Sequence, residues 1–359
     1  ASSEITTSAE PSGQIKGFLE HLQMGVVMGD GSKFEKDEIC DISNIQELVL
    51  EQPEKLKCLH HKYLEAGSDV LQALTFCSFM AGSVDNLKVK KLNNTACEIV
   101  CKLAADQNSL VAGSICLNAD HIKGKDKTHV QTYVKQEMEV FLNCKVDVIL
   151  CDIFLVEETE WALEVLKNIG VPIAVTLCVD KLGTISGTSL GDCAIRMAKA
   201  GANVVGVCCK FDESPKVVIE YVERMKNALD RVGLQGYIMS CSHANELPDN
   251  RNHSNHLNQT FTMKSFEPFE QSVENLNARA LYEAGVRFFR AGSGLGTSYI
   301  QHLSNELLNE RAKMPIDIKS SGNVTMDKYQ PNRKGSKQYW RSDISPSCYS
   351  TTFNLPESA

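Results

Sequence analysis

Cysteines are the side chains of this sequence with the greatest capacity for chemistry. The chain contains 14 of them. Thiolates are common zinc ligands, so cysteines gathered at one edge of a sheet would indicate a tetrahedral metal site. Free cysteine is also a small residue that is often buried, so packing is the other interpretation. No Cys-x-x-Cys spacing decides between them. Seven cysteines end or follow short apolar runs: Cys77, Cys116, Cys151, Cys178, Cys208, Cys209 and Cys241.

Two other side chains stand where a predicted strand ends. Asp30 lies between two glycines, a pattern that indicates a tight turn and could also direct a carboxylate into a site. His243 ends another apolar run, whereas His60 and His61 fall within a helical pattern and are expected at the surface. The sequence has no P-loop, so it gives no support to an NTPase.

These residues must be positioned by an alternation of strands and helices. Helical segments separate the apolar runs, and most of them end at a glycine, as a helix C-cap often does. Such alternation predicts parallel strands joined by right-handed crossovers. The apolar runs predict strands over 25–28, 70–75, 110–115, 146–150, 172–178, 202–207, 236–240 and 286–290.

Eight strand–helix units favour an α/β fold of the closed (β/α)8 TIM-barrel type. An open doubly wound sheet is the alternative, although no G-x-G-x-x-G follows a strand, which counts against a dinucleotide-binding fold. In a barrel the carboxyl ends of the strands meet at one mouth, where barrel enzymes hold their chemistry. The seven cysteines at predicted strand ends, together with Asp30 and His243, would all lie at this mouth.

The composition of the chain limits which classes of function remain. The 359 residues are 43% hydrophobic, and 37 basic against 45 acidic side chains give a net charge of −8. This balance argues against nucleic acid or a membrane surface as the partner. Residues 1–14 are polar without signal-peptide features, so we expect a mobile tail and a cytoplasmic protein. We expect the barrel over 15–318. The segment 319–359 is rich in spaced aromatics and predicts either an oligomerisation arm or a surface extension.

Several motifs together resemble the betaine–homocysteine S-methyltransferases, which belong to the homocysteine S-methyltransferase family. The likeness extends from about Gly25 to Trp340, and the motifs that carry it include 27–31, 66–68, 156–162, 191–193, 199–202, 206–212 and 284–287. The resemblance implies a barrel in which three cysteine thiolates hold zinc. One follows the sixth strand, and two lie in a Gly-Gly-Cys-Cys-Gly motif after the eighth. The zinc would keep the homocysteine sulfur as a thiolate, which attacks a methyl group of betaine.

The sequence departs from this pattern at the metal ligands. Cys209 matches the first ligand, but Gly292 and Ser293 stand where the adjacent pair is expected. No cysteine occurs between Cys241 and Cys348, so a shift in alignment cannot supply that pair. A catalytic zinc site needs about three protein ligands. The family site is therefore expected to be incomplete.

Substrate positions are altered as well. The resemblance places Cys151 and Asp152 where the family has a glutamate and a tyrosine, and Cys77 where it has another tyrosine. Asp30 is retained, and Glu267 matches a further homocysteine contact.

Three functions are compatible with these residues. The favoured one is a non-catalytic structural or binding subunit without a cofactor, which forms a homo-oligomer (a dimer or tetramer) or part of a larger assembly. The second is an active methyltransferase whose zinc site is rebuilt from Cys209 together with neighbouring groups. The third is a cysteine-lined mouth that binds a small thiol or apolar compound. The groups open to the rebuilt zinc site are Cys151, Cys208, Cys241 and His243.

Overall fold

The computed structural model describes most of the predicted barrel. Contacts within the chain define one compact unit from Ile15 to Lys313, which contains every described residue. The segments 1–14 and 319–359, expected as tail and extension, lie outside the described residues. The described ranges are 17–30, 49–75, 86–117, 126–153, 156–179, 184–185, 187–210, 215–243, 278–292 and 295–311.

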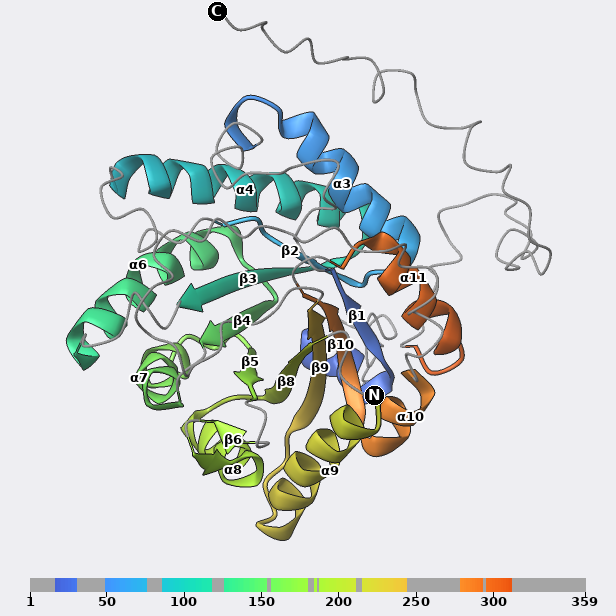
Figure 1. The fold of residues 1–359 in the computed structure, drawn as a ribbon. Coiled ribbons are helices and arrows are strands. Elements are labelled where there is room, and N and C mark those ends of the chain that lie inside the picture. Colours follow the sequence, from blue (N-terminus) through green and yellow to red (C-terminus); the bar gives the residue numbers. More distant parts are fainter. Residues whose placement is uncertain are drawn as a thin grey trace, which may run out of the picture. The chain divides into compact units, whose positions relative to one another are not determined.

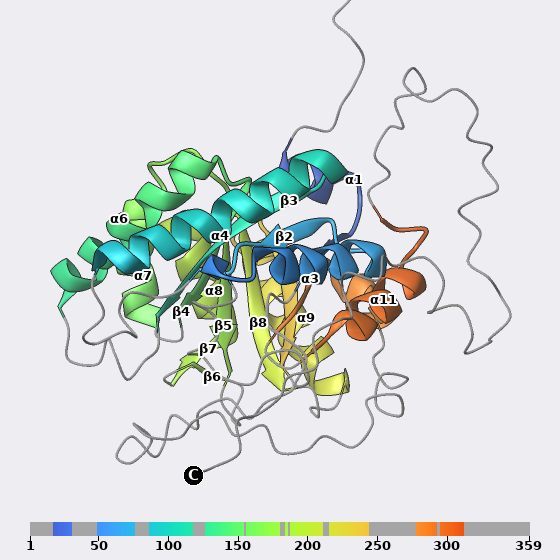
Figure 2. The same ribbon diagram turned by 90° about the horizontal axis from the view of Figure 1, so that it is seen from above.

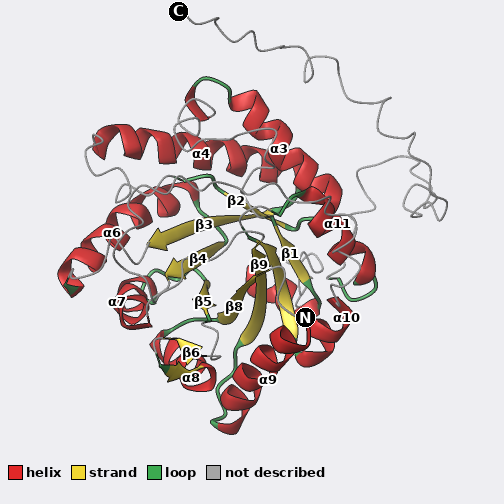
Figure 3. Ribbon diagram, viewed as in Figure 1, coloured by secondary structure: helices red, strands yellow, loops and turns green. Residues whose placement is uncertain are grey.

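Parallel strands form a closed barrel, with the order β1-β10-β9-β8-β5-β4-β3-β2 (Figures 1 and 3). The closing pair is β1 with β10, in which Val27 lies opposite Phe288. The predicted (β/α)8 barrel is thus confirmed and the open sheet is excluded. The strands are β1 (Val27–Gly29), β2 (Val70–Gln72), β3 (Leu110–Leu117), β4 (Val148–Ile153), β5 (Ile173–Cys178), β8 (Val204–Lys210), β9 (Tyr237–His243) and β10 (Val286–Ala291).

Helices surround these strands, as the perpendicular views show (Figures 1 and 2). An antiparallel pair, β6 (Thr184–Ile185) with β7 (Thr188–Ser189), lies outside the barrel and was not predicted. None of the helices in the described ranges is long and apolar enough to cross a bilayer. The helices are α1 (Phe18–Met24), α3 (Pro53–Ala66), α4 (Asn86–Gln107), α6 (Lys127–Cys144), α7 (Val156–Leu166), α8 (Leu190–Ala200), α9 (Pro215–Arg231), α10 (Ala278–Ala284) and α11 (Thr297–Glu306).

The part of the barrel interior nearest the amino-terminal ends of the strands is apolar. It is built by inward side chains near the starts of the strands, among them Val148, Val204 and Phe288. Helix α1 packs against the same cluster, with the ring of Phe18 edge-on to Phe288 at 5.1 Å. Among the described residues, α1 and this apolar cluster fill and cover the amino-terminal end of the barrel, so we expect the functional site at the carboxyl-terminal end.

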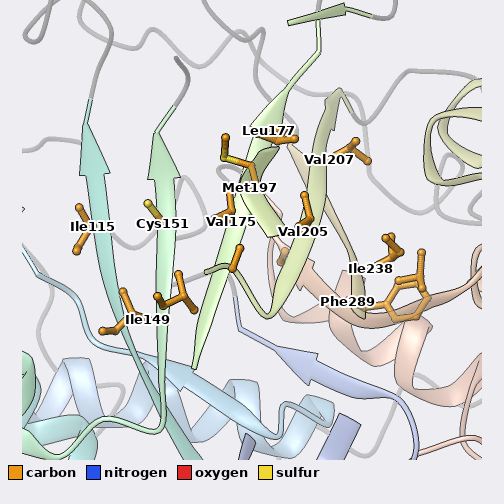
Figure 4. Close-up of a cluster of buried hydrophobic side chains, with 14 of the residues drawn as sticks. Ile115, Ile149, Cys151, Val175, Leu177, Met197, Val205, Val207, Ile238 and Phe289 are labelled. Atoms are coloured by element: carbon orange, nitrogen blue, oxygen red, sulfur yellow. The ribbon is translucent and has the colours of Figure 1, made fainter. Parts of the chain in front are cut away.

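A larger apolar layer separates the strands from the helices (Figure 4). Alternate residues of each strand contribute to it, such as Ile149, Val175 and Val205, and Met197 of α8 packs among them. Strands buried on both faces carry near-continuous apolar runs. This burial explains why the runs could be recognised in the sequence, whereas the direction of each side chain could not.

Side chains just before three strands bind the preceding barrel strand. Asp69 accepts a hydrogen bond from the backbone N–H of Met28 at 2.8 Å, Asp147 from Val111 at 2.8 Å, and Asn203 from Ile173 at 2.9 Å. Each contact fixes the register of two neighbouring strands at the amino-terminal end. The predicted strands over 146–150 and 202–207 begin too early for this reason, since Asp147 and Asn203 serve as such anchors.

The carboxylate of Asp147 makes the stability of the folded chain depend on pH. Burial raises the pKa of Asp147 above the ordinary value, and the hydrogen bond from Val111 opposes this only in part. The folded state therefore holds the proton more tightly than the unfolded state does, and its stability falls as pH rises through the titration range. We expect wild type to lose stability relative to Asp147→Asn as pH rises from about 3 through the carboxyl titration range, measured by urea unfolding.

Asp126 serves as a control, because its pKa is shifted in the opposite direction. A hydrogen bond from His129 lowers the pKa of this N-cap aspartate of α6. Wild type should therefore gain stability relative to Asp126→Asn over the same pH range, because the charged form is favoured in the folded state. The same sign for both variants would contradict the assignment.

Candidate functional site

An ion pair crosses the barrel at its carboxyl-terminal end. Arg290 on β10 donates from Nη1 to Oδ1 of Asp152 on β4 at 2.9 Å, and from Nη2 to Oδ2 at 2.5 Å. Nη1 also donates to Oγ1 of Thr176 on β5 at 3.4 Å. In the strand order β4 lies opposite β10, so this two-pronged contact spans the barrel interior. Bidentate pairs of this kind fix both partners in place.

The pair is well shielded from water. The side chain of Arg290 is 6% exposed and that of Asp152 is 15% exposed. Burial by itself would lower the pKa of Arg290, but the charge of Asp152 and the nearby sulfurs of Cys241 and Cys208 raise it above the ordinary value. Arg290 therefore remains a cation at any physiological pH. Its Nε is buried and has no hydrogen-bond partner among the residues that the structure describes.

Three thiols lie next to Arg290 at paired positions on neighbouring strands of the barrel. Neighbouring strands place Cys178 opposite Cys208, Cys208 opposite Cys241, and Cys241 opposite Arg290. These positions share the inward phase of Val204, which lies in the interior cluster. The predicted gathering of cysteines at one rim is thus confirmed for these three. Every cysteine whose side chain the structure describes is a free thiol rather than half of a disulfide.

Cys151 belongs to the other face of its strand. It is fully buried in the layer between strands and helices, beside Ile149 and Val175 (Figure 4). The expectation that Cys151 lines the mouth is wrong, because successive residues of a strand point to opposite sides. Asp152 is the inward residue at the end of β4, so a carboxylate, rather than a thiol, faces the interior there.

The carboxylate of Asp30 contacts residues of β2 and α3. Its Oδ1 accepts from the backbone N–H of Gln72 at 2.8 Å, and its Oδ2 lies 3.3 Å from Nδ1 of His60 on α3. Both side chains are 1% exposed. The expectation that His60 lies at the surface is wrong, because α3 turns this residue onto the barrel and only His61 outward. Nε2 of His60 is buried, and no described residue forms a hydrogen bond with it. That Asp30 contacts a substrate stays a prediction.

The expected zinc ligands are described only in part. The backbone of Cys209 lies in β8 opposite Ser242, and the N–H of Gly292 donates to the carbonyl of Ser242 at 2.6 Å. The side chains of Cys209 and His243 lie outside the described part of the structure. Residues Cys77, Glu267 and Ser293 lie wholly outside it. Among the described side chains, no three His, Cys, Asp or Glu residues are arranged to hold a metal ion.

A sequence model of homocysteine S-methyltransferase matches residues 27–307. The chain belongs to the homocysteine S-methyltransferase family. It is 34% identical over 313 residues to an S-methylmethionine–homocysteine S-methyltransferase of Pongo abelii, covering 84% of each chain. It is 31% identical over 348 residues to betaine–homocysteine S-methyltransferase 1 of Bos taurus, covering 90% of this chain and 84% of the relative.

The homocysteine S-methyltransferase barrel is also found among solved structures. The metallated form of the homocysteine methyltransferase MmuM from Escherichia coli superposes with a TM-score of 0.59 at 16% identity. The match covers 78% of this chain and 96% of that one. At this identity the likeness supports the fold alone.

Arg290 was missed by the sequence interpretation. A cation at the end of the apolar run Val286–Ala291, in phase with Phe288, is the signal that could have revealed it. In the motif expected from the homocysteine S-methyltransferase family, two glycines precede the cysteine pair. The resemblance, which places Gly292 and Ser293 at that pair, implies that Arg290 and Ala291 stand at the glycine positions.

Proposed function

We propose that this chain is a homocysteine S-methyltransferase-like barrel that no longer carries out zinc-dependent methyl transfer and acts as a binding or structural subunit. The observation that supports this most directly is the contact of Arg290 with both carboxylate oxygens of Asp152 across the barrel mouth. The guanidinium takes up space in the mouth, and it engages the inward carboxylate that could otherwise hold a substrate ammonium group.

Zinc does not fit this mouth. Gly292 has no side chain to offer as a ligand, and only Cys209 matches the family's set of three. The guanidinium of Arg290 also lies beside Cys208 and Cys241 and adds no metal ligand to the mouth. We therefore derive no reaction step through a metal. Self-association through 319–359 and a cytoplasmic location remain predictions.

The test is elemental analysis of untreated full-length protein, together with assays for methionine formation from homocysteine. Betaine and S-methylmethionine should both be offered as methyl donors, with the Bos taurus relative assayed in parallel. We expect zinc far below one ion per chain and no methionine above background. Stoichiometric zinc with methionine formation would establish the active enzyme with a rebuilt site instead.

A restoration variant makes the test sharper. Arg290→Gly, Ala291→Gly, Gly292→Cys and Ser293→Cys together recreate the Gly-Gly-Cys-Cys-Gly motif. With Cys209 they supply three thiolates, so this variant should bind zinc. The matched control carries only Arg290→Gly and Ala291→Gly, which open the space without adding ligands, and it should remain free of zinc. Equal zinc in the two variants would contradict the role given to the missing cysteine pair.

A further inference from the structure

Two cysteines face each other on the barrel wall where β8 pairs with β9. Cys208 on β8 is the register partner of Cys241 on β9. Val205 and Val207 belong to the layer between strands and helices (Figure 4), so Cys208, which alternates with them along β8, faces the barrel interior. Cys241 has the same phase as Met239, which lies in the interior cluster. The two thiols are therefore opposite each other on one face of neighbouring strands.

The two strands approach each other closely on this interior face. Gly206 is the register partner of Met239, one inward pair before the cysteines. A Cβ at Gly206 would lie 2.6 Å from the Cβ of Met239, and the three atoms nearest to it all belong to Met239 rather than to β5. A disulfide needs Cβ atoms about 3.5–4.5 Å apart and Cα atoms about 4.4–6.8 Å apart. Neighbouring strands are about 4.8 Å apart, so the spacing suits a bond from Cys208 to Cys241.

The position of Arg290 distinguishes Cys241 from the other two thiols. Arg290 on β10 is the register partner of Cys241, whereas Cys178 on β5 lies on the far side of Cys208. A guanidinium beside a sulfur favours the thiolate, which is the form of cysteine that reacts with oxidants. Cys241 is thus the nucleophile of the pair. Its thiol neighbour, on the side away from the cation, is Cys208.

Burial of the two sulfurs restricts the oxidant to a small molecule. Cys208 is 1% exposed and Cys241 is 0% exposed. A peptide-sized disulfide such as oxidised glutathione is too large to reach a sulfur at this depth. Hydrogen peroxide is little larger than a water molecule, so a small hydroperoxide is the class of oxidant that fits.

We propose that Cys208 and Cys241 form a cross-strand disulfide in the barrel when a small hydroperoxide reaches them. The Cys241 thiolate attacks one oxygen of the hydroperoxide. The O–O bond breaks, and the sulfur is oxidised by two electrons to a sulfenic acid as hydroxide or alkoxide leaves. The sulfur of Cys208 then attacks that of Cys241, and the displaced hydroxyl group leaves as water with the Cys208 proton. An external dithiol reverses the change.

This reaction is independent of the proposed loss of methyl transfer. Of the zinc ligands that the resemblance implies, only Cys209 is matched, and neither Cys208 nor Cys241 is one of them. A zinc ion held by Cys208 or Cys241 would protect that sulfur from oxidation. Zinc content is therefore measured on the sample that is oxidised. Bound zinc with both thiols protected would overturn the disulfide and favour a rebuilt zinc site, whereas zinc-free protein without a disulfide would overturn the disulfide alone.

The experiment exposes the reduced full-length chain to hydrogen peroxide at neutral pH, blocks the remaining thiols and maps linked peptides by mass spectrometry. We expect the peptide that contains Cys208 to be joined to the one that contains Cys241, and dithiothreitol to separate them. Oxidised glutathione should leave the folded chain unlinked. A linkage of Cys178, rather than Cys241, to Cys208 would overturn the proposal. Equally fast linkage by oxidised glutathione would contradict the restriction to a small oxidant.

Cys209→Ser is the matched control, because Cys209 lies next to Cys208 on β8 and has the opposite phase. This variant should keep the linkage. Cys208→Ser should lose it, and dimedone should then label Cys241 as a sulfenic acid. Arg290→Ala combined with Asp152→Asn removes both charges of the ion pair and should form the linkage several-fold more slowly. Persistence of the linkage in Cys208→Ser would make Cys209 the partner and overturn the proposal.

Discussion

Arg290→Ala is expected to lower the free energy of unfolding by about 3–5 kcal/mol, because it leaves the carboxylate of Asp152 uncompensated inside the barrel. Both charges are almost fully shielded, and the pair joins opposite strands. Removing one member of a buried pair costs more than the pair itself contributes, since the remaining ion has lost both water and partner. Urea unfolding followed by far-ultraviolet circular dichroism measures the change.

A double-mutant cycle tests whether the loss comes from this contact. Asp152→Asn combined with Arg290→Ala should be less destabilised than the sum of the single variants, by about 1–3 kcal/mol. The exposed pair Arg224–Glu220 on α9 is the control, with side chains 51% and 53% exposed. Arg224→Ala should cost no more than about 0.5 kcal/mol. Additive effects at 290 and 152 would show that the two side chains act independently.

Gly206→Ala is expected to destabilise the barrel by about 3 kcal/mol, through crowding at the wall of β8. A Cβ at this position would lie 2.5 Å from the carbonyl oxygen of Met239 and 2.6 Å from its Cβ. Met239 is the partner of Gly206 in the next strand, so neither can retreat without disturbing the strand pairing. Thermal and urea unfolding of the variant both report this loss.

Gly236→Ala is the matched control just before β9. The nearest atom to a Cβ there is Cδ1 of Leu229 at 3.5 Å, an ordinary contact, and the backbone is not in the left-handed region. The change should be nearly neutral, or stabilising by about 0.5 kcal/mol, because alanine reduces the freedom of the unfolded chain. Equal losses at 206 and 236 would mean that close strand contact is not the cause.

In this barrel of the homocysteine S-methyltransferase family, different residues maintain the fold and occupy the mouth. The apolar layers and the anchors Asp69, Asp147 and Asn203 maintain the strand registers independently of the mouth. Arg290 and Asp152 then supply a cross-barrel contact at the end where the family places its reaction. A barrel can therefore keep its fold with a stabilising ion pair at the mouth, which is consistent with the proposed loss of methyl transfer.

The alternation of strands and helices, the parallel sheet and the strand ends at which chemistry could occur were all predictable from the amino-acid sequence. Local signals were sufficient, because apolar runs and helix-ending residues act over a few neighbours. Gly201, for example, ends α8 in the left-handed region with φ at 117°, as a glycine C-cap predicts. The rim position of Cys178, Cys208 and Cys241 followed from the same reasoning.

Which side chains face each other could be seen only in the folded chain. Strand β4 is apolar on both faces, so its pattern could not show that Cys151 points toward the helices and Asp152 into the barrel. The partner of Arg290 lies 138 residues away in sequence, and Asp30, the partner of His60, lies 30 residues away. Such contacts arise from barrel closure and helix packing, which bring together residues that share no local signal.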